Sequence, residues 1–200
     1  MSEGATQPGA GDLAIGLHSH MPYVEGFGTY PFGEEWLFDA VIRSHLPVLE
    51  IARDLTMTVT PVLADQLEAE DARERLETFL RDHRLGAAKR DVESADPDYV
   101  DAARAEVRRY ERSLSLLEAT GGDPLAAFAA ARDRNVSLIP SSATHAVLPL
   151  LATRAGLDVQ VATGIASHRR RFGESRGFWL PECTYRPGQA SDHERQQVEW

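Results

Sequence analysis

The stretch Leu13-Ala14-Ile15-Gly16-Leu17-His18-Ser19-His20 is the first evidence for the fold. A short apolar run bounded by turn-prone residues is typical of a strand that is buried on both faces. Two histidines follow at the C-terminal end of the run, and Pro22 ends it. Side chains alternate along an extended chain, so the two imidazoles point to the same side. The stretch therefore predicts a buried strand with polar side chains at its end.

Three further segments repeat this design. Strands are predicted at 57–60, 136–139 and 177–180, each followed by a proline, and helices at 35–53, 65–83, 97–119, 125–132, 148–153 and 159–172. Alternating strands and helices favour an α/β fold with a parallel sheet and helical crossovers. Polar residues follow the third strand (141–145) and the fourth (Glu182) as well as the first. Active sites of such sheets lie at these C-terminal strand ends.

The domain organisation follows from the number of strands. Four strands cannot close a barrel, which typically needs about eight. We therefore expect residues 13–200 to be the N-terminal part of a larger catalytic domain, truncated at its C-terminus. Residues 1–12 are rich in Gly, Ser, Thr and Gln and are expected to form a disordered N-terminus.

Composition narrows the class of protein. The chain is 42% hydrophobic and 26% charged, as in ordinary globular proteins, and its net charge is −10. A nucleic-acid partner would require a basic face, and the dense basic run 168–171 is interpreted as a solvated helix face. No stretch approaches the ~18 apolar residues of a membrane-spanning helix. The single cysteine allows no internal disulfide, and a cytoplasmic location is the default expectation.

Glu182 is the candidate catalytic residue. It lies in Phe178-Trp179-Leu180-Pro181-Glu182-Cys183-Thr184-Tyr185-Arg186-Pro187, after an apolar strand and between aromatic residues. Aromatic faces stack on sugar rings, and a carboxylate can attack an anomeric carbon. The alternative is a structural glutamate that pairs with Arg186 or caps a helix. The neighbouring Cys183 has no basic residue spaced to activate its thiol.

The histidines and Trp36 allow two interpretations each. His18 and His20, together with His145 in Ser142-Ala143-Thr144-His145, can hydrogen-bond sugar hydroxyls or bind a metal ion. Each of them can equally be a structural histidine. Trp36 begins a predicted helix and is either a core residue or a platform for a sugar.

Four segments together resemble glycoside hydrolase family 57. Their order and spacing match that family from about residue 13 to residue 189. The segments are His18-Ser19-His20-Met21-Pro22-Tyr23-Val24 with Pro31-Phe32-Gly33-Glu34-Glu35-Trp36, then Thr60-Pro61-Val62-Leu63-Ala64-Asp65-Gln66-Leu67, then Ser142–His145 with Leu148–Leu151, and finally Gly177–Pro187. The glutamate-cysteine pair followed by Tyr185-Arg186-Pro187 is most similar to the 1,4-α-glucan branching enzymes of the family.

The resemblance implies a fold and a site. It implies the N-terminal portion of an incomplete (β/α)7 TIM-like barrel with a helical insertion, and retaining chemistry through a covalent glycosyl-enzyme. Glu182 falls on the nucleophile, and His18 and His145 fall on residues that line the donor glucose subsite. His20, Trp36 and Trp179 fall on positions that shape the pocket. The implied substrate is an α-glucan, and no metal or organic cofactor is expected.

One departure from the family pattern concerns the acid/base aspartate. By resemblance it lies on a strand beyond Trp200, so we expect the 200-residue chain to be catalytically incomplete. The predicted function is that of a retaining branching enzyme. The alternatives are a family 57 α-amylase or 4-α-glucanotransferase, a metal-dependent deacetylase or hydrolase that uses the histidines, and a non-catalytic glucan-binding fragment. Acceptor preference, chain-length preference and oligomeric state do not follow from the sequence.

Overall fold

A small parallel sheet forms the centre of the molecule. The computed structural model describes residues 13–31 and 33–185, so the predicted disordered N-terminus lies outside it. The strands are β1 (Gly16–Ser19), β2 (Leu55–Val59) and β3 (Val136–Ile139), in the order β1-β2-β3. All pair in parallel. The predicted α/β class with parallel strands and helical crossovers is confirmed.

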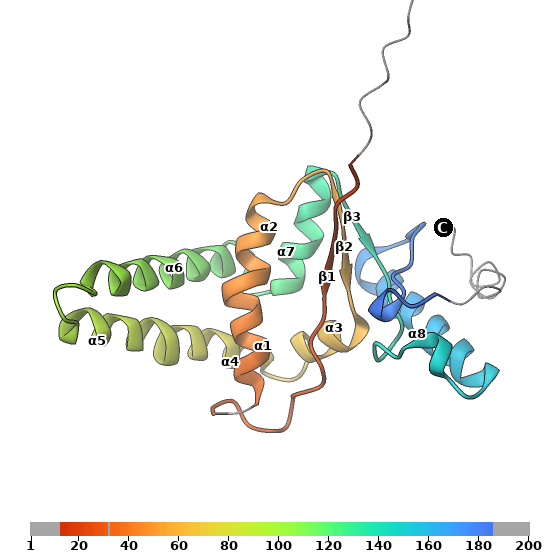
Figure 1. The fold of residues 1–200 in the computed structure, drawn as a ribbon, viewed down its shortest axis with the longest axis horizontal. Coiled ribbons are helices and arrows are strands. Elements are labelled where there is room, and N and C mark those ends of the chain that lie inside the picture. The colour runs from red at the N-terminus through yellow and green to blue at the C-terminus, as the bar shows by residue number, and fades with distance from the viewer. Residues whose placement is uncertain (1–12, 32, 186–200) are drawn as a thin grey trace, which may run out of the picture.

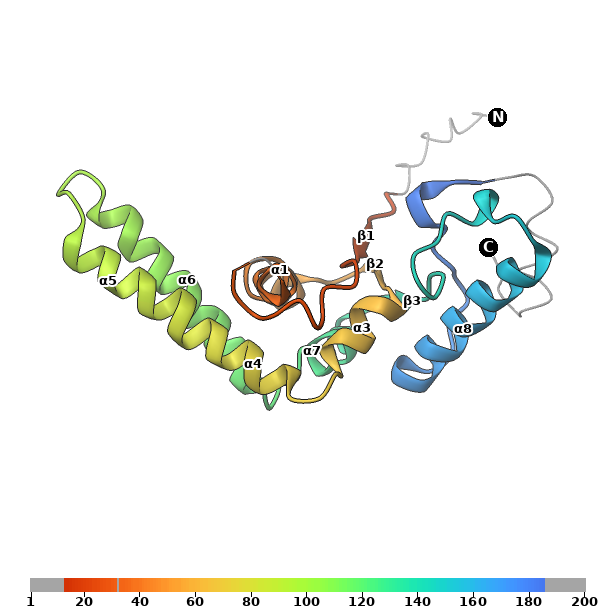
Figure 2. The same cartoon turned by 90° about the horizontal axis from the view of Figure 1, so that it is seen from below.

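Helices connect and cover the strands. The helical elements are α1 (Glu34–Ala40), η1 (Val41–His45), α2 (Leu46–Ile51), α3 (Pro61–Leu67), α4 (Ala72–Thr78), η2 (Phe79–Leu85), α5 (Gly86–Ser94), α6 (Val100–Ala119), α7 (Pro124–Ala131), η3 (Arg132–Arg134), η4 (Leu148–Leu150), α8 (Arg154–Phe172) and η5 (Pro181–Cys183). The helices α1, α2 and α7 lie on one side of the strands and α8 lies on the other (Figure 1). Helices α5 and α6 pack against each other and extend away from the sheet (Figure 2).

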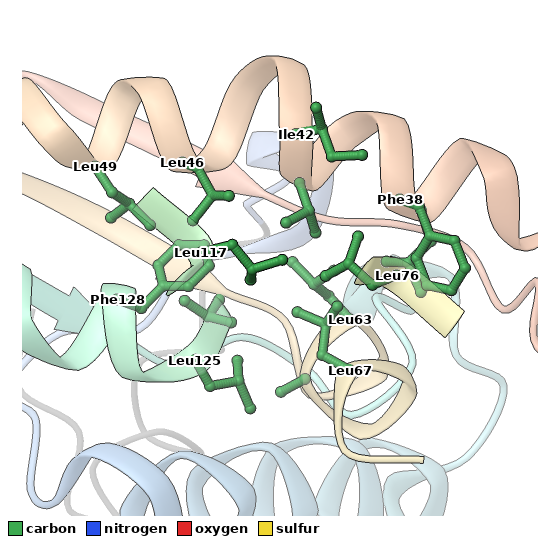
Figure 3. Close-up of a cluster of buried hydrophobic side chains, with 14 of the residues drawn as sticks. Phe38, Ile42, Leu46, Leu49, Leu63, Leu67, Leu76, Leu117, Leu125 and Phe128 are labelled. Carbon is green, nitrogen blue, oxygen red and sulfur yellow. The ribbon is translucent and has the colours of Figure 1, made fainter. Parts of the chain in front are cut away.

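The main core lies between α3, α6, α7 and the α1–α2 helix, which is the continuous helical segment formed by α1, η1 and α2. Phe38, Ile42, Leu46 and Leu49 recur at steps of four and three, so they share one face of the α1–α2 helix. They point toward Leu63, Leu67, Leu117, Leu125 and Phe128 from the other helices (Figure 3). Each buried Leu or Phe side chain contributes about 1.5–3 kcal/mol. This packing fixes β2 and α3, which carry part of the site described below.

The prediction that residues 13–17 are buried on both faces is wrong. Leu13 is 85% exposed and Ile15 is 46% exposed. The paired register of β1 with β2 begins at Gly16, so these two side chains precede the ladder. They extend beyond the core, whereas Leu17 packs against it.

The predicted fourth strand is reduced to a single bridge. Ser141 pairs in parallel with Trp179, and the Trp179 amide donates to the Pro140 carbonyl at 2.8 Å. The Ser141 hydroxyl donates to the Trp179 carbonyl at 3.0 Å. The position and direction of this segment are therefore as predicted, but its length is not.

Two predicted helices differ from the observed ones. The helix expected at 65–83 is broken at Asp71, which has a φ of 56° in the left-handed region that a helix interior does not allow. The segment 148–153 forms a short 3-10 turn at η4 instead of an α-helix. Thr153 then caps α8, because its hydroxyl accepts a hydrogen bond from the Gly156 amide at 3.0 Å. Asp123 caps α7 in a similar way, because its side chain accepts a hydrogen bond from the Leu125 amide at 2.9 Å.

Candidate active site

His18 is held at the C-terminal end of β1 by the neighbouring strand. The register places His18 opposite Thr58 of β2. Its Nδ1 forms a short hydrogen bond with the Thr58 hydroxyl, and the Ser19 amide donates to the same oxygen at 3.3 Å. Thr58 is fully buried. A rigid group in the sheet therefore fixes the plane of the His18 ring.

His20 repeats this arrangement two residues later. Its Nδ1 lies 3.1 Å from the hydroxyl of Thr60. The backbone pairing continues past β2, because the Thr60 amide donates to the Ser19 carbonyl at 3.1 Å. The alternation of side chains in both strands therefore places two histidine–threonine pairs on the same side of the sheet.

His145 lies in the loop after β3 and contacts both histidines. Its Nε2 is 2.8 Å from the His18 Nε2, and its ring stacks on that of His20 with centroids 4.0 Å apart. The His145 backbone has a φ of 58°. Strained backbone of this kind costs of order 1–3 kcal/mol and is often found at functional sites.

The loop that carries His145 is fixed against α8. The Ala143 amide donates to the Gln160 carbonyl, and the Thr144 amide donates to the Gln160 side chain, each at 3.0 Å. A Cβ at Gly164 would lie 2.0 Å from the Ser141 carbonyl oxygen. Glycine is therefore required where α8 crosses the start of this loop.

Glu182 and Trp179 complete the cluster. Glu182 Oε1 lies 3.7 Å from His145 Nδ1, while the side chain remains 66% exposed. Its backbone has a φ of 55° within η5, and Cys183 follows with a φ of 53°. The Trp179 ring stacks on His18, with centroids 5.0 Å apart and an angle of 12° between the planes.

The structure thus brings five of the six predicted site residues together. These are His18, His20, His145, Trp179 and Glu182. The sixth, Trp36, is 56% exposed in the first turn of α1. Within the described residues no ring contact or hydrogen bond joins Trp36 to the cluster, so its role stays a prediction. Arg186, the alternative partner of Glu182, lies outside the described residues.

The three imidazoles are neutral at pH 7. Burial, together with the proximity of His145, lowers the pKa of His18 to about 4. Burial also lowers the pKa of His20 to about 4, with smaller contributions from the other two rings. The pKa of His145 is lowered by burial, an effect that the Glu182 carboxylate opposes. A neutral imidazole offers one hydrogen-bond donor and one acceptor, as sugar hydroxyls require.

The geometry does not suit a metal ion shared by these histidines. Zinc–nitrogen bonds of about 2.0–2.1 Å in a tetrahedral site place two ligand nitrogens about 3.3 Å apart. The Nε2 atoms of His18 and His145 are 2.8 Å apart, and Nδ1 of His18 is occupied by Thr58. Among residues 13–31 and 33–185, no three His, Cys, Asp or Glu side chains are arranged to hold a metal.

A cavity of about 790 Å³ opens beside His20. It lies between the segment after β1, the start of α3, the loop after β3 and one face of α8. Its lining includes Tyr23, Thr144 and Arg170. Its volume is within the range of small-ligand sites, about 300–1,000 Å³. The cluster therefore borders a space large enough for sugar units.

Thr58 and Thr60 are not among the site residues predicted from the sequence. Thr58 and Thr60 are two residues apart, as are His18 and His20, and this shared spacing is the signal in the sequence that could have suggested the two pairs. The spacing predicts the pairs only when the register of the strands is known, which places His18 opposite Thr58.

The basic run on α8 is only partly a solvated face. His168 is buried, and Arg171 is largely buried in an ion pair with Glu68 at 2.6 Å. Arg170 is exposed and lies 3.1 Å from the same carboxylate. The prediction of a solvated face is therefore wrong for His168 and Arg171. The two arginines are paired with two carboxylates, those of Asp65 and Glu68, which argues against a phosphate site.

No helix in the described part of the chain combines the length and apolarity needed to cross a membrane.

Comparison with known proteins identifies relatives of this chain. A 1,4-α-glucan branching enzyme of Thermococcus kodakarensis, TK1436, is 36% identical over 189 residues, which are 88% of this chain and 28% of that protein. A probable 1,4-α-glucan branching enzyme of Mycobacterium tuberculosis is 27% identical over 94% of this chain and 40% of that protein. The chain therefore spans less than half the length of these relatives.

Solved structures share the fold. An α-amylase of Thermotoga maritima, AmyC, superposes with a TM-score of 0.85 at 27% identity, over 93% of this chain and 38% of that one. The TK1436 branching enzyme, solved in complex with glucose, gives a TM-score of 0.79 at 34% identity, over 86% of this chain and 33% of that one. These are TIM-like barrel enzymes, and the chain corresponds to part of the barrel.

The family model for glycosyl hydrolase family 57 matches residues 14–192, which include every member of the cluster. This chain therefore belongs to glycosyl hydrolase family 57.

Proposed function

We propose that this chain is part of a retaining α-glucan transglycosylase of the 1,4-α-glucan branching type, with Glu182 as its nucleophile. One observation carries the proposal. An exposed carboxylate, held on a strained turn, lies 3.7 Å from His145 in a cluster of three neutral histidines and a tryptophan. Two curated relatives at 36% and 27% identity are named as branching enzymes, which supports the same interpretation.

The cluster supports a division of roles. A Glu182 oxygen attacks the anomeric carbon of the donor glucose while the glycosidic bond to the departing chain breaks. The imidazoles of His18 and His145 bond donor hydroxyls, and His20 and Trp179 shape the pocket around them. A second carboxyl group about 5 Å from the first protonates the leaving oxygen in retaining enzymes. We assign that role to a residue outside this chain, so the isolated chain should not branch amylose.

Transfer to a 6-hydroxyl distinguishes branching from hydrolysis or 4-α-transfer. The α-amylase of Thermotoga maritima shares the fold, so the fold alone does not select among these reactions. The names of the sequence relatives favour branching. A cytoplasmic role in glycogen or starch metabolism is proposed with it, and it rests on those names and on the single cysteine.

Binding of α-glucan to the isolated chain tests the substrate class. Maltoheptaose added to the 200-residue chain should shift the NMR signals of the His18, His145 and Trp179 rings, whereas cellohexaose, a β-linked glucose oligomer, should not. His145→Ala should weaken maltoheptaose binding about 5- to 150-fold, because a buried hydrogen-bond partner is worth about 1–3 kcal/mol. The control is His83→Ala, which replaces an exposed histidine on η2 and should leave maltoheptaose binding unchanged. Equal shifts with both sugars, or none with maltoheptaose, would contradict the proposal.

A further inference from the structure

The hydroxyl of Thr58 has a defined direction. The Ser19 amide can only donate, so Thr58 Oγ1 accepts that bond. A fully buried hydroxyl hydrogen also needs an acceptor of its own. His18 Nδ1 is the other group within hydrogen-bond distance of this oxygen in the described structure. Thr58 therefore donates its hydrogen to Nδ1 of His18.

This direction fixes the tautomers of two histidines. A neutral His18 that accepts at Nδ1 carries its proton on Nε2, which then donates to His145 Nε2 at 2.8 Å. His145 accepts at Nε2, so its own proton is on Nδ1. That N–H faces Glu182 Oε1 at 3.7 Å. The pKa of His18 is about 4, and the pKa of His145 is lowered from its usual value. Both agree with neutral rings.

We propose that Thr58 is a positioning residue, whose buried hydroxyl, acting through His18, keeps an N–H of His145 directed at the Glu182 carboxylate. The inference rests on the proposed function for the role of Glu182. The opposite tautomer would direct a nitrogen lone pair at the carboxylate and repel it. The N–H instead attracts the carboxylate and favours a single orientation of the Glu182 side chain toward His145.

Thr60 provides a matched control in the same strand extension. Its hydroxyl lies 3.1 Å from His20 Nδ1, so it forms the same kind of pair. His20 contacts His145 by ring stacking. Within the described residues, no hydrogen bond leads from His20 to His145 or Glu182. Removing the Thr60 hydroxyl should therefore leave the tautomers of His18 and His145 unchanged.

Long-range proton–nitrogen NMR of the histidine rings in the 200-residue chain, at pH 7, tests this directly. In the wild type, His18 should be protonated at Nε2 and His145 at Nδ1. Thr58→Val keeps the side-chain shape and should raise the minor tautomer of both rings about 2- to 13-fold, because one hydrogen bond is worth about 0.5–1.5 kcal/mol. Thr58→Ser should restore the wild-type pattern, and Thr60→Val should not change it.

Several results would overturn the inference. Protonation of wild-type His18 at Nδ1 would by itself overturn the inference, even if the valine variant does not fold. Unchanged tautomer populations of His18 and His145 in folded Thr58→Val would also overturn it. The ring signals are read without sugar, so they are independent of the proposed function. Loss of maltoheptaose binding with the stated tautomers intact would count against that function and not against the role of Thr58.

Discussion

Gln66 is expected to be a main support of the candidate site. It is fully buried in α3, and its amide group forms hydrogen bonds with the backbone of the segment that follows His20. The group makes five hydrogen bonds, which join it to the amides of Val24 and Glu25 and to the carbonyls of Met21, Pro22 and Val62. Replacement by leucine keeps much of the volume and removes all five bonds.

The cost of Gln66→Leu follows from which partners are buried. The Val24 amide, bonded at 2.6 Å, is in a buried residue and loses its partner, at a cost of about 1–3 kcal/mol. Glu25 and Pro22 are nearer the surface and can turn to water, so they add less. We expect a total near 3 kcal/mol, a large part of a typical stability of about 5–15 kcal/mol.

Urea unfolding measures this cost. The midpoint should fall in Gln66→Leu while the slope stays unchanged, because the surface exposed on unfolding is similar. Gln160→Leu is the matched control. Its amide bonds the exposed Thr144, so it should lose less than about 1.5 kcal/mol. A loss in Gln66→Leu no greater than in the control would refute the assigned role.

Two further predictions concern charge. In the wild type the buried Glu34 carboxylate is paired with Arg75 at 2.7 Å, and Arg75→Met removes this cation, which should destabilise the fold by about 3–5 kcal/mol. Arg81→Met is the control, because Arg81 pairs only with exposed carboxylates, and it should cost less than about 1 kcal/mol; equal losses in thermal or urea unfolding would contradict the prediction. Burial lowers the pKa of His45 to about 4, so the unfolded chain takes up this proton first as pH falls from about 6.5 to 4, and stability falls with it. His45→Met should reduce the slope of unfolding free energy against pH in that window by up to about 1.4 kcal/mol per unit, and an unchanged slope would exclude the effect.

The strand ends are predictable because their chemistry is local. Each apolar run ends at a polar residue or a proline, and parallel strands bring their C-terminal ends to one edge. These two facts suffice to predict that His18, His20, His145 and Glu182 lie together. The observed contacts among the four side chains confirm that proximity.

The parts that were not predicted depend on long-range geometry. The pairing of His18 with Thr58 requires the register between strands that are 40 residues apart. The position of His145 depends on a left-handed backbone and on Gln160 of α8, neither of which has a local sequence signal. The exposure of Leu13 likewise depends on where pairing with β2 begins, which an apolar run does not reveal.

The central claim is that Glu182 attacks the anomeric carbon of an α-glucosyl donor. An α-glucosyl fluoride with a second, ring-bound fluorine tests it in the 200-residue chain, because fluoride leaves without a general acid while the second fluorine slows release of the glycosyl-enzyme. A Glu182 oxygen bonds to the anomeric carbon as the carbon–fluorine bond breaks. Mass spectrometry of the digested protein should find one added sugar on Glu182 in the wild type and none in Glu182→Gln. An unlabelled wild-type Glu182, or equal labelling of the glutamine variant, would contradict the account.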